Sequence, residues 1–189
     1  MRRPQGDRAS SGVLGLALVA AVALAGCGIG ANGNAASVPV ASAGPAAAIT
    51  GAVDQTRGEI ANALASISSV PVQFGESSRP YRPPESGRLR DAPRAVFQVV
   101  LPDQPDAGFI VIYDFRDAAA AVDAGNEEAG YLGTGPARVA LPRDAQHVLR
   151  QVGSTLVLYT WSPSAATDRT AGVVAGVLST IGIGFTVPN

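Results

Sequence analysis

The sequence of 189 residues contains no lysine, one cysteine, one histidine and one tryptophan. Without lysine there is no Walker-type phosphate loop, no Schiff-base chemistry and no serine–lysine nucleophile pair. A single cysteine and a single histidine exclude an internal disulfide and any zinc site built from several such ligands. We therefore expect no metal and no cofactor.

Basic and acidic residues are nearly equal in number. All 14 basic residues are arginine, and they stand against 15 acidic residues for a net charge of −1. This balance provides no broad basic surface to neutralise phosphates, so we expect no nucleic-acid partner. Hydrophobic residues make up 47% of the chain, which is enough for a core, and the length favours one domain with appended segments.

The N-terminal segment has the pattern of an export signal. Arg2 and Arg3 begin a short basic segment, and an uncharged apolar run follows from Val13 to Ala25. At about 1.5 Å of rise per residue, this run is shorter than the ~30 Å hydrocarbon core of a bilayer. Such a length is typical of the apolar segment of a signal peptide.

The apolar run ends in Leu24-Ala25-Gly26-Cys27. These residues resemble the lipobox of bacterial lipoproteins, in which a leucine and two small residues precede an invariant cysteine. The resemblance implies that residues 1–26 are a signal peptide removed before Cys27, and that the Cys27 sulfur carries a diacylglyceryl group. It further implies an extracytoplasmic protein anchored to the cell membrane, since two or three acyl chains anchor stably where one does not. The alternatives are an ordinary secretory signal with a chance cysteine, or a retained short anchor.

The next segment, residues 27–48, is predicted to be a flexible tether behind the lipidated cysteine. It is uncharged and rich in alanine, glycine and asparagine, so it offers nothing to bury. Residues 49–189 are predicted to form a single α+β domain.

A helix is predicted over residues 49–70, where Thr50 can cap the start and Pro71 ends it. Its apolar positions fall on one stripe: Val53, Ile60, Leu64 and Ile67. Residues 71–94, rich in proline and arginine, lack periodicity and are interpreted as an extended loop over the domain surface.

Residues 95–189 indicate two hairpins, each followed by a helix. The strands are expected at 96–101, 109–115, 146–152 and 155–161, the helices at 118–129 and 164–181, and short strands at 139–141 and 185–187. The order α-ββ-α-ββ-α predicts a four-stranded, mostly antiparallel sheet with helices on one face. The second face would be free, or covered by the N-terminal helix and the Arg-rich loop.

Two strands look alike. Residues 110–113 and 156–159 match in kind at every position, 46 residues apart, and each strand runs into an alanine-rich helix. The body is therefore compatible with two copies of a ββα unit. The alternative is that any two buried strands resemble each other.

The strongest binding candidate is a cluster of five arginines in the loop, because guanidinium groups grip phosphate or carboxylate in bidentate fashion. The cluster consists of Arg79, Arg82, Arg88, Arg90 and Arg94. Its partner would be an anionic envelope component or an acidic protein. The alternative is a solvated loop balanced by Glu76, Glu85 and Asp91.

His147 is the only candidate general base near neutral pH, but no G-x-S-x-G elbow places a serine nucleophile beside it. The carboxylate pairs Asp103/Asp106 and Glu127/Glu128 would need to face one cleft to act as acid and base. The sequence thus predicts a membrane-anchored lipoprotein of the bacterial envelope that binds without catalysis, with a secreted hydrolase using His147 or a carboxylate pair as the alternative.

Overall fold

The structure is a computed structural model that describes residues 50–67 and 73–188. The described residues all belong to one compact unit. The predicted signal peptide, Cys27 with its lipobox and the predicted tether lie outside the described residues. Within the described part, no helix combines the length and the apolar character needed to cross a bilayer.

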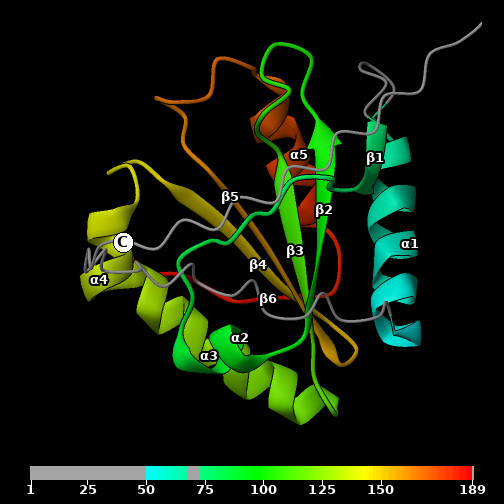
Figure 1. Cartoon of the computed structure of the whole chain (residues 1–189), viewed down its shortest axis with the longest axis vertical. Helices are drawn as coiled ribbons and strands as arrows, with labels where there is room; N and C mark the ends of the chain where they lie inside the picture. The colour runs from blue at the N-terminus through cyan, green and yellow to red at the C-terminus, as the bar shows by residue number, and fades with distance from the viewer. Residues whose placement is uncertain (1–49, 68–72, 189) are drawn as a thin grey trace, which may run out of the picture. The chain divides into compact units, whose positions relative to one another are not determined.

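The described residues form six strands and five helices (Figure 1). In chain order these are α1 (Gly51–Ala65), β1 (Gln73–Glu76), α2 (Gly87–Asp91), β2 (Arg94–Val100), β3 (Phe109–Asp114), α3 (Ala118–Gly133), α4 (Gly135–Ala140), β4 (Gln146–Val152), β5 (Thr155–Trp161), α5 (Thr170–Leu178) and β6 (Ile183–Gly184).

All six strands belong to one antiparallel sheet in the order β1-β2-β3-β5-β4-β6. The hairpins β2–β3 and β4–β5 join through β3 and β5, where Ile112 lies opposite Val157. The α+β class and the antiparallel pairing are therefore confirmed. The prediction of four strands is wrong because β1 and β6 extend the two edges of the sheet.

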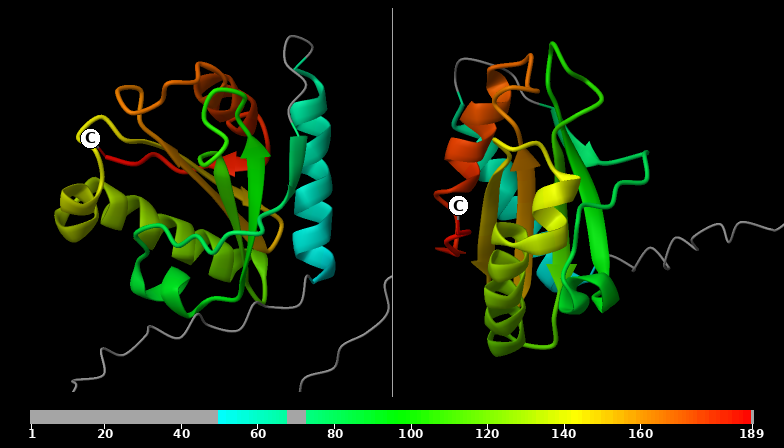
Figure 2. Two further views of the ribbon diagram at one scale, coloured as in Figure 1. Left: turned by 45° about the horizontal axis from the view of Figure 1, so that its top comes forward. Right: turned by 90° about the vertical axis from the view of Figure 1, so that its left-hand side faces the viewer.

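Helices cover both faces of the sheet, so the prediction of helices on one face is also wrong (Figures 1 and 2). On one face α1 and α5 pack against a set of strand residues that includes Phe97, Ile110, Ile112, Val157 and Tyr159. On the other face α2, α3 and α4 pack against Val111, Tyr113, Leu149, Leu156 and Leu158. The central strands are continuous apolar runs because both of their faces are buried.

The sequence match between 110–113 and 156–159 does not correspond to a structural repeat. Ile110 packs toward α1 and α5, whereas Leu156, 46 residues later, packs toward α2, α3 and α4. The helices that follow the two hairpins, α3 and α5, also lie on opposite faces of the sheet. The alternative interpretation, that two buried strands resemble each other, accounts for the match.

Two predicted helix starts are confirmed at the level of their caps. The Thr50 hydroxyl accepts a hydrogen bond from the Val53 amide at 3.3 Å, and the Asp117 carboxylate accepts one from the Ala120 amide at 2.7 Å. These bonds satisfy amides that the first turn of a helix leaves unpaired. Gly153 has φ +57° in the β4–β5 turn, as a tight mirror-type turn requires.

Other boundaries differ from the predictions. Helix α1 ends at Ala65 rather than residue 70, α3 continues to Gly133, and α5 is confined to Thr170–Leu178. Residues 135–140 form α4 and not a lead-in to a strand at 139–141. The edge strand expected at 185–187 is β6, two residues earlier in the chain. The segment 71–94, predicted to be a loop, contains β1 and α2. Leu89 is fully buried against α3 and anchors the short helix α2.

The C-terminal segment after β6 returns across α3. The Phe185 amide donates a hydrogen bond to the Leu149 carbonyl oxygen at 3.0 Å. Two glycines of α3 make room for the segment: Gly125 faces the Phe185 ring and Gly133 faces Pro188. A side chain at either glycine would overlap the segment. This packing brings residues 185–188 beside the start of β4 and creates the wall of a pocket.

Candidate functional site

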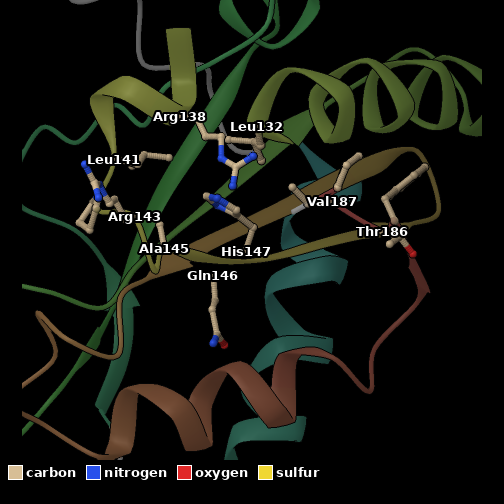
Figure 3. A pocket seen from close by; sticks show the side chains of 12 residues that line it. Leu132, Arg138, Leu141, Arg143, Ala145, Gln146, His147, Thr186 and Val187 are labelled. Atoms are coloured by element: carbon tan, nitrogen blue, oxygen red, sulfur yellow. The ribbon is translucent and has the colours of Figure 1, made fainter. Parts of the chain in front are cut away.

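A pocket of about 320 Å³ lies between α4, the α4–β4 connection, the start of β4 and the C-terminal segment (Figure 3). Leu132 at the end of α3 and Leu141 contribute apolar carbon on one side, and residues 185–188 form the other side. The elements that meet here come from parts of the chain about 50 residues apart. The volume lies at the small end of ligand-binding pockets, which run from about 300 to 1,000 Å³.

Among the described residues, the titratable side chains that line the pocket are Arg138, Arg143 and His147, and none of the lining residues is acidic. Figure 3 shows the Arg138 guanidinium directed toward the His147 imidazole, with Arg143 beside Leu141 on the same rim. Neither arginine forms an ion pair with any residue in the described ranges. The pocket therefore concentrates unpaired positive charge.

Asp144 is the acidic residue nearest in sequence, and its carboxylate is fully engaged elsewhere. Its Oδ1 accepts hydrogen bonds from the hydroxyls of Ser162 (2.6 Å) and Ser164 (2.8 Å), and its Oδ2 accepts one from the Ser164 amide (2.6 Å). The hydrogen bond from the Ser162 hydroxyl is the largest cause of a lowered Asp144 pKa. Asp144 does not line the pocket and forms no ion pair with either arginine.

His147 is held at the start of β4 by Thr160 on the neighbouring strand. The His147 Nδ1 lies 3.0 Å from the Thr160 hydroxyl, and burial lowers the pKa of the imidazole below its ordinary value of 6.5. The ring is therefore mostly neutral at pH 7. Thr160 does not line the pocket, and Asp144 makes no hydrogen bond to the imidazole, so these groups do not form a nucleophile–base–acid array.

Four of the five loop arginines predicted to bind an anion form ion pairs with carboxylates of the described residues, and two of them share Glu85. Glu85, only 4% exposed, is the centre of the largest group. Its Oε1 accepts hydrogen bonds from Arg94 Nη1 and the Tyr113 hydroxyl, both at 2.8 Å, and its Oε2 accepts one from Arg82 Nε at 2.7 Å. Burial and the charge of Glu85 raise the pKa of Tyr113, so the phenol remains a donor.

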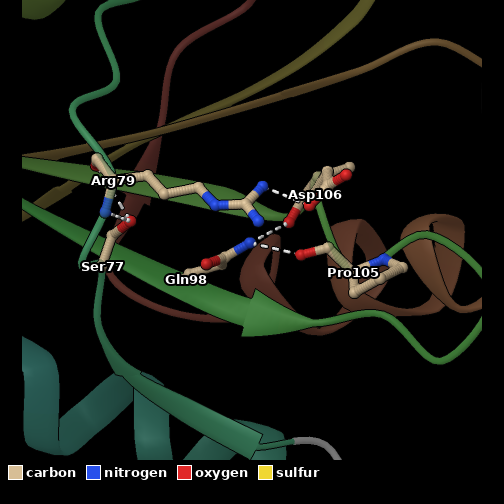
Figure 4. A network of polar contacts seen from close by, with 6 residues as sticks. Ser77, Arg79, Gln98, Pro105 and Asp106 are labelled. Atoms are coloured by element: carbon tan, nitrogen blue, oxygen red, sulfur yellow. Dashed lines mark hydrogen bonds and ion pairs between the residues drawn. The ribbon is translucent and has the colours of Figure 1, made fainter.

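The other loop arginines also meet carboxylates. Arg79 pairs with Asp106 in the β2–β3 connection (Figure 4), and Arg88 Nε lies 2.7 Å from a Glu127 carboxylate oxygen in α3. Arg90 has no ion-pair partner among residues 50–67 and 73–188. Two of the five guanidinium groups, those of Arg79 and Arg88, thus tie the segment to other parts of the domain, while Arg82 and Arg94 pair with Glu85, one of the acids expected to balance the loop. Anion binding by the cluster remains a prediction.

The candidate acid pairs of the hydrolase alternative are divided. Glu127 faces Arg88, whereas Glu128 is fully buried and its Oε2 accepts a hydrogen bond from the Ser86 amide at 2.8 Å. Burial raises the pKa of Glu128. Asp106 pairs with Arg79, and Asp103 lies elsewhere in the same connection, where its amide donates to Asp168. In the described ranges no group of three or more His, Cys, Asp or Glu side chains is arranged to hold a metal ion.

Comparison with protein-family models gives no match, and no curated protein and no solved structure is detectably similar to the chain. The site must therefore be interpreted from its own residues.

Arg138 and Arg143 were not among the residues singled out in the sequence. A local signal was present, because two arginines and the only histidine fall within ten residues with Asp144 as the single acid among them. The pocket wall formed by residues 185–188 had no such signal, since it depends on packing against α3.

Proposed function

We propose that this protein is a bacterial envelope lipoprotein, anchored through lipid on Cys27, whose α+β domain binds a small ligand in the His147 pocket and is not catalytic. One observation carries the binding role: two arginines without ion-pair partners in the described residues meet at a pocket that no acidic side chain lines. The anchoring role is supported by the resemblance of Leu24-Ala25-Gly26-Cys27 to a lipobox.

The pocket supports a binding role better than the loop cluster does. Charged side chains at a protein surface are ordinarily solvated or paired, and four loop arginines have carboxylates within the fold. Arg138 and Arg143 instead flank a concave space of a size that suits a small molecule. In the loop cluster, Arg90 is the one arginine without an ion-pair partner among the described residues. It alone would be unpaired for the anionic envelope component that the sequence predicted as the partner of this cluster.

The hydrolase alternative is less well supported by the geometry. A general base must reach the proton of a nucleophile or of water in the cavity, and the hydroxyl that hydrogen-bonds to His147 belongs to Thr160, outside the pocket lining. We expect a panel of chromogenic esters and glycosides to be turned over equally slowly by the wild type and His147→Ala. Turnover by the wild type that His147→Ala abolishes, with the fold intact, would contradict the non-catalytic role.

Anchoring is tested by mass spectrometry of the N-terminal peptide from the full chain produced in a bacterium. We expect cleavage before Cys27 and a diacylglyceryl mass on its sulfur, with the protein partitioning into detergent. The matched variant Cys27→Ser should keep its leader and carry no lipid. A wild-type protein with free Cys27 in the aqueous phase would refute the anchor.

A further inference from the structure

We infer that the pocket between α4, β4 and residues 185–188 is a binding site for a small organic oxyanion, with the carboxylate or phosphate group held by Arg138 and Arg143. This inference rests on the proposed binding function and names the chemical class of its ligand. Carboxylate and phosphate share the feature that matters here, an oxygen pair that guanidinium groups bind in bidentate fashion.

The charged side chains that line the pocket are all arginines, as far as the described residues show. Arg138 comes from α4 and Arg143 from the α4–β4 connection, and both residues line the same cavity. In Figure 3 the Arg138 guanidinium lies beside His147, whereas that of Arg143 lies apart from it, next to Leu141. The one acidic residue of this stretch, Asp144, is withdrawn by three hydrogen bonds to Ser162 and Ser164. With the local carboxylate engaged, the guanidinium groups are left for a ligand from outside the chain.

His147 adds a hydrogen-bonding group to the same cavity. Its Nδ1 is engaged with Thr160, and its Nε2 has no hydrogen-bond partner among the described residues. The neutral imidazole favoured by burial adds no charge of its own. The two arginines therefore set the preference for an anion, and His147 adds a hydrogen-bonding contact to the ligand.

Size restricts the ligand further. A cavity of about 320 Å³ corresponds to the volume of about ten liquid waters, so it accommodates a short dicarboxylate or a phosphomonoester. Leu132, Leu141 and Val187 line the cavity beside the cations and offer carbon surface to the body of such a molecule.

The single histidine makes a direct test available, because the imidazole carbon-bound protons of His147 give unique NMR signals. The compact unit, residues 41–189, is titrated with succinate, inorganic phosphate and glycerol phosphate, and separately with succinamide, glycerol and sodium chloride at matched ionic strength. We expect saturable shifts with at least one oxyanion and none with the neutral compounds or chloride. A response to succinate alone assigns a carboxylate ligand, and a response to phosphate or its ester assigns a phosphate ligand.

Variants connect the signal to the arginines. Arg138→Gln and Arg143→Gln should each weaken the oxyanion affinity about tenfold or more, as expected for loss of a charge-assisted hydrogen bond. Arg169→Gln is the matched control, since Arg169 also lacks an ion-pair partner in the described residues but lies at the start of α5, outside the pocket lining and the loop cluster; it should leave the affinity unchanged.

The inference would be overturned by the absence of a saturable shift with any oxyanion, or by an affinity of the Arg138→Gln and Arg143→Gln variants equal to that of the wild type. Saturable shifts with succinamide or glycerol as strong as with the anions would also overturn it, while leaving a binding pocket in place. Loss of lipid on Cys27 would defeat the anchoring proposal without affecting this titration.

Discussion

Replacing Gly125 by alanine tests whether the C-terminal segment is packed against α3 as described. A Cβ at Gly125 would lie 2.7 Å from Cε1 of Phe185 and nearer still to Cζ, closer than carbon atoms approach without displacement. Phe185 lines the pocket, so its displacement should also disturb the binding site. Gly130, on the same helix, has no atom within 4 Å of such a Cβ and provides the matched control.

The two substitutions share one favourable contribution and differ in one unfavourable contribution. Alanine stabilises a helix interior relative to glycine by about 0.5–1 kcal/mol, so Gly130→Ala should raise the free energy of unfolding by that amount. Gly125→Ala gains the same propensity but forces overpacking, which costs about 1–3 kcal/mol. The difference between the two variants should therefore be about 1–3 kcal/mol, and it measures the steric conflict alone.

Urea unfolding followed by the fluorescence of the single tryptophan, Trp161, measures both free energies. Combining Gly125→Ala with Phe185→Ala should recover part of the loss, because the second change removes the ring that the new methyl group meets. If Gly125→Ala and Gly130→Ala stabilise the protein equally, Phe185 does not pack on α3 and the pocket wall is not formed as described.

Three other outcomes follow from the buried polar groups and from the pocket. Glu85→Ala should lower the free energy of unfolding by about 3–5 kcal/mol in urea unfolding, because it strands the half-buried cations and the Tyr113 hydroxyl, whereas exposed Glu76→Ala should change little. Glu128→Gln should stabilise the protein by on the order of 1 kcal/mol at pH 7, since Oε1 of Glu128 lacks a partner among the described residues. Because burial raises the folded pKa of Glu128 above its ordinary value of 4.5, the unfolded chain loses that proton first, so wild-type stability should fall as pH rises through the interval above 4.5. Unfolding measured from pH 4 to pH 8 should show that this loss is absent in Glu128→Gln; an unchanged pH profile would contradict the raised pKa. Finally, Gly125→Ala should weaken oxyanion binding measured by calorimetry, and an unchanged affinity would mean that Phe185 is not part of the binding site.

The strands and caps could be predicted from local patterns, and the layers could not. Thr50 and Asp117 cap helices through bonds within three residues, so their effect is visible in sequence. The continuous apolar runs 109–113 and 156–159 indicated burial on both faces of the sheet. The helices that follow the two hairpins were nevertheless expected on one and the same face. Helix α2 escaped detection because a five-residue helix depends on Leu89 fitting into the fold rather than on periodicity.

The site was less predictable because it depends on distant pairings. Arg79 meets Asp106 and Arg88 meets Glu127 at separations that no spacing rule gives, whereas the balancing of loop arginines by Glu85 was one of the two interpretations that the sequence left open. The pocket arises where Phe185 packs on Gly125, sixty positions apart. His147 was recognised as a candidate, but its surroundings were set by that packing.

Thermal melting of residues 41–189 with small oxyanions tests the central claim, that the pocket binds such an anion, most directly. A ligand at about a hundredfold its dissociation constant adds roughly 2.7 kcal/mol to the free energy of unfolding. For a unit of this size that corresponds to a rise in Tm of about 5–10 °C. The account predicts this rise with succinate, phosphate or glycerol phosphate and its loss in the double variant Arg138→Gln/Arg143→Gln. An unchanged Tm with every oxyanion, or the same rise in the double variant, would contradict it.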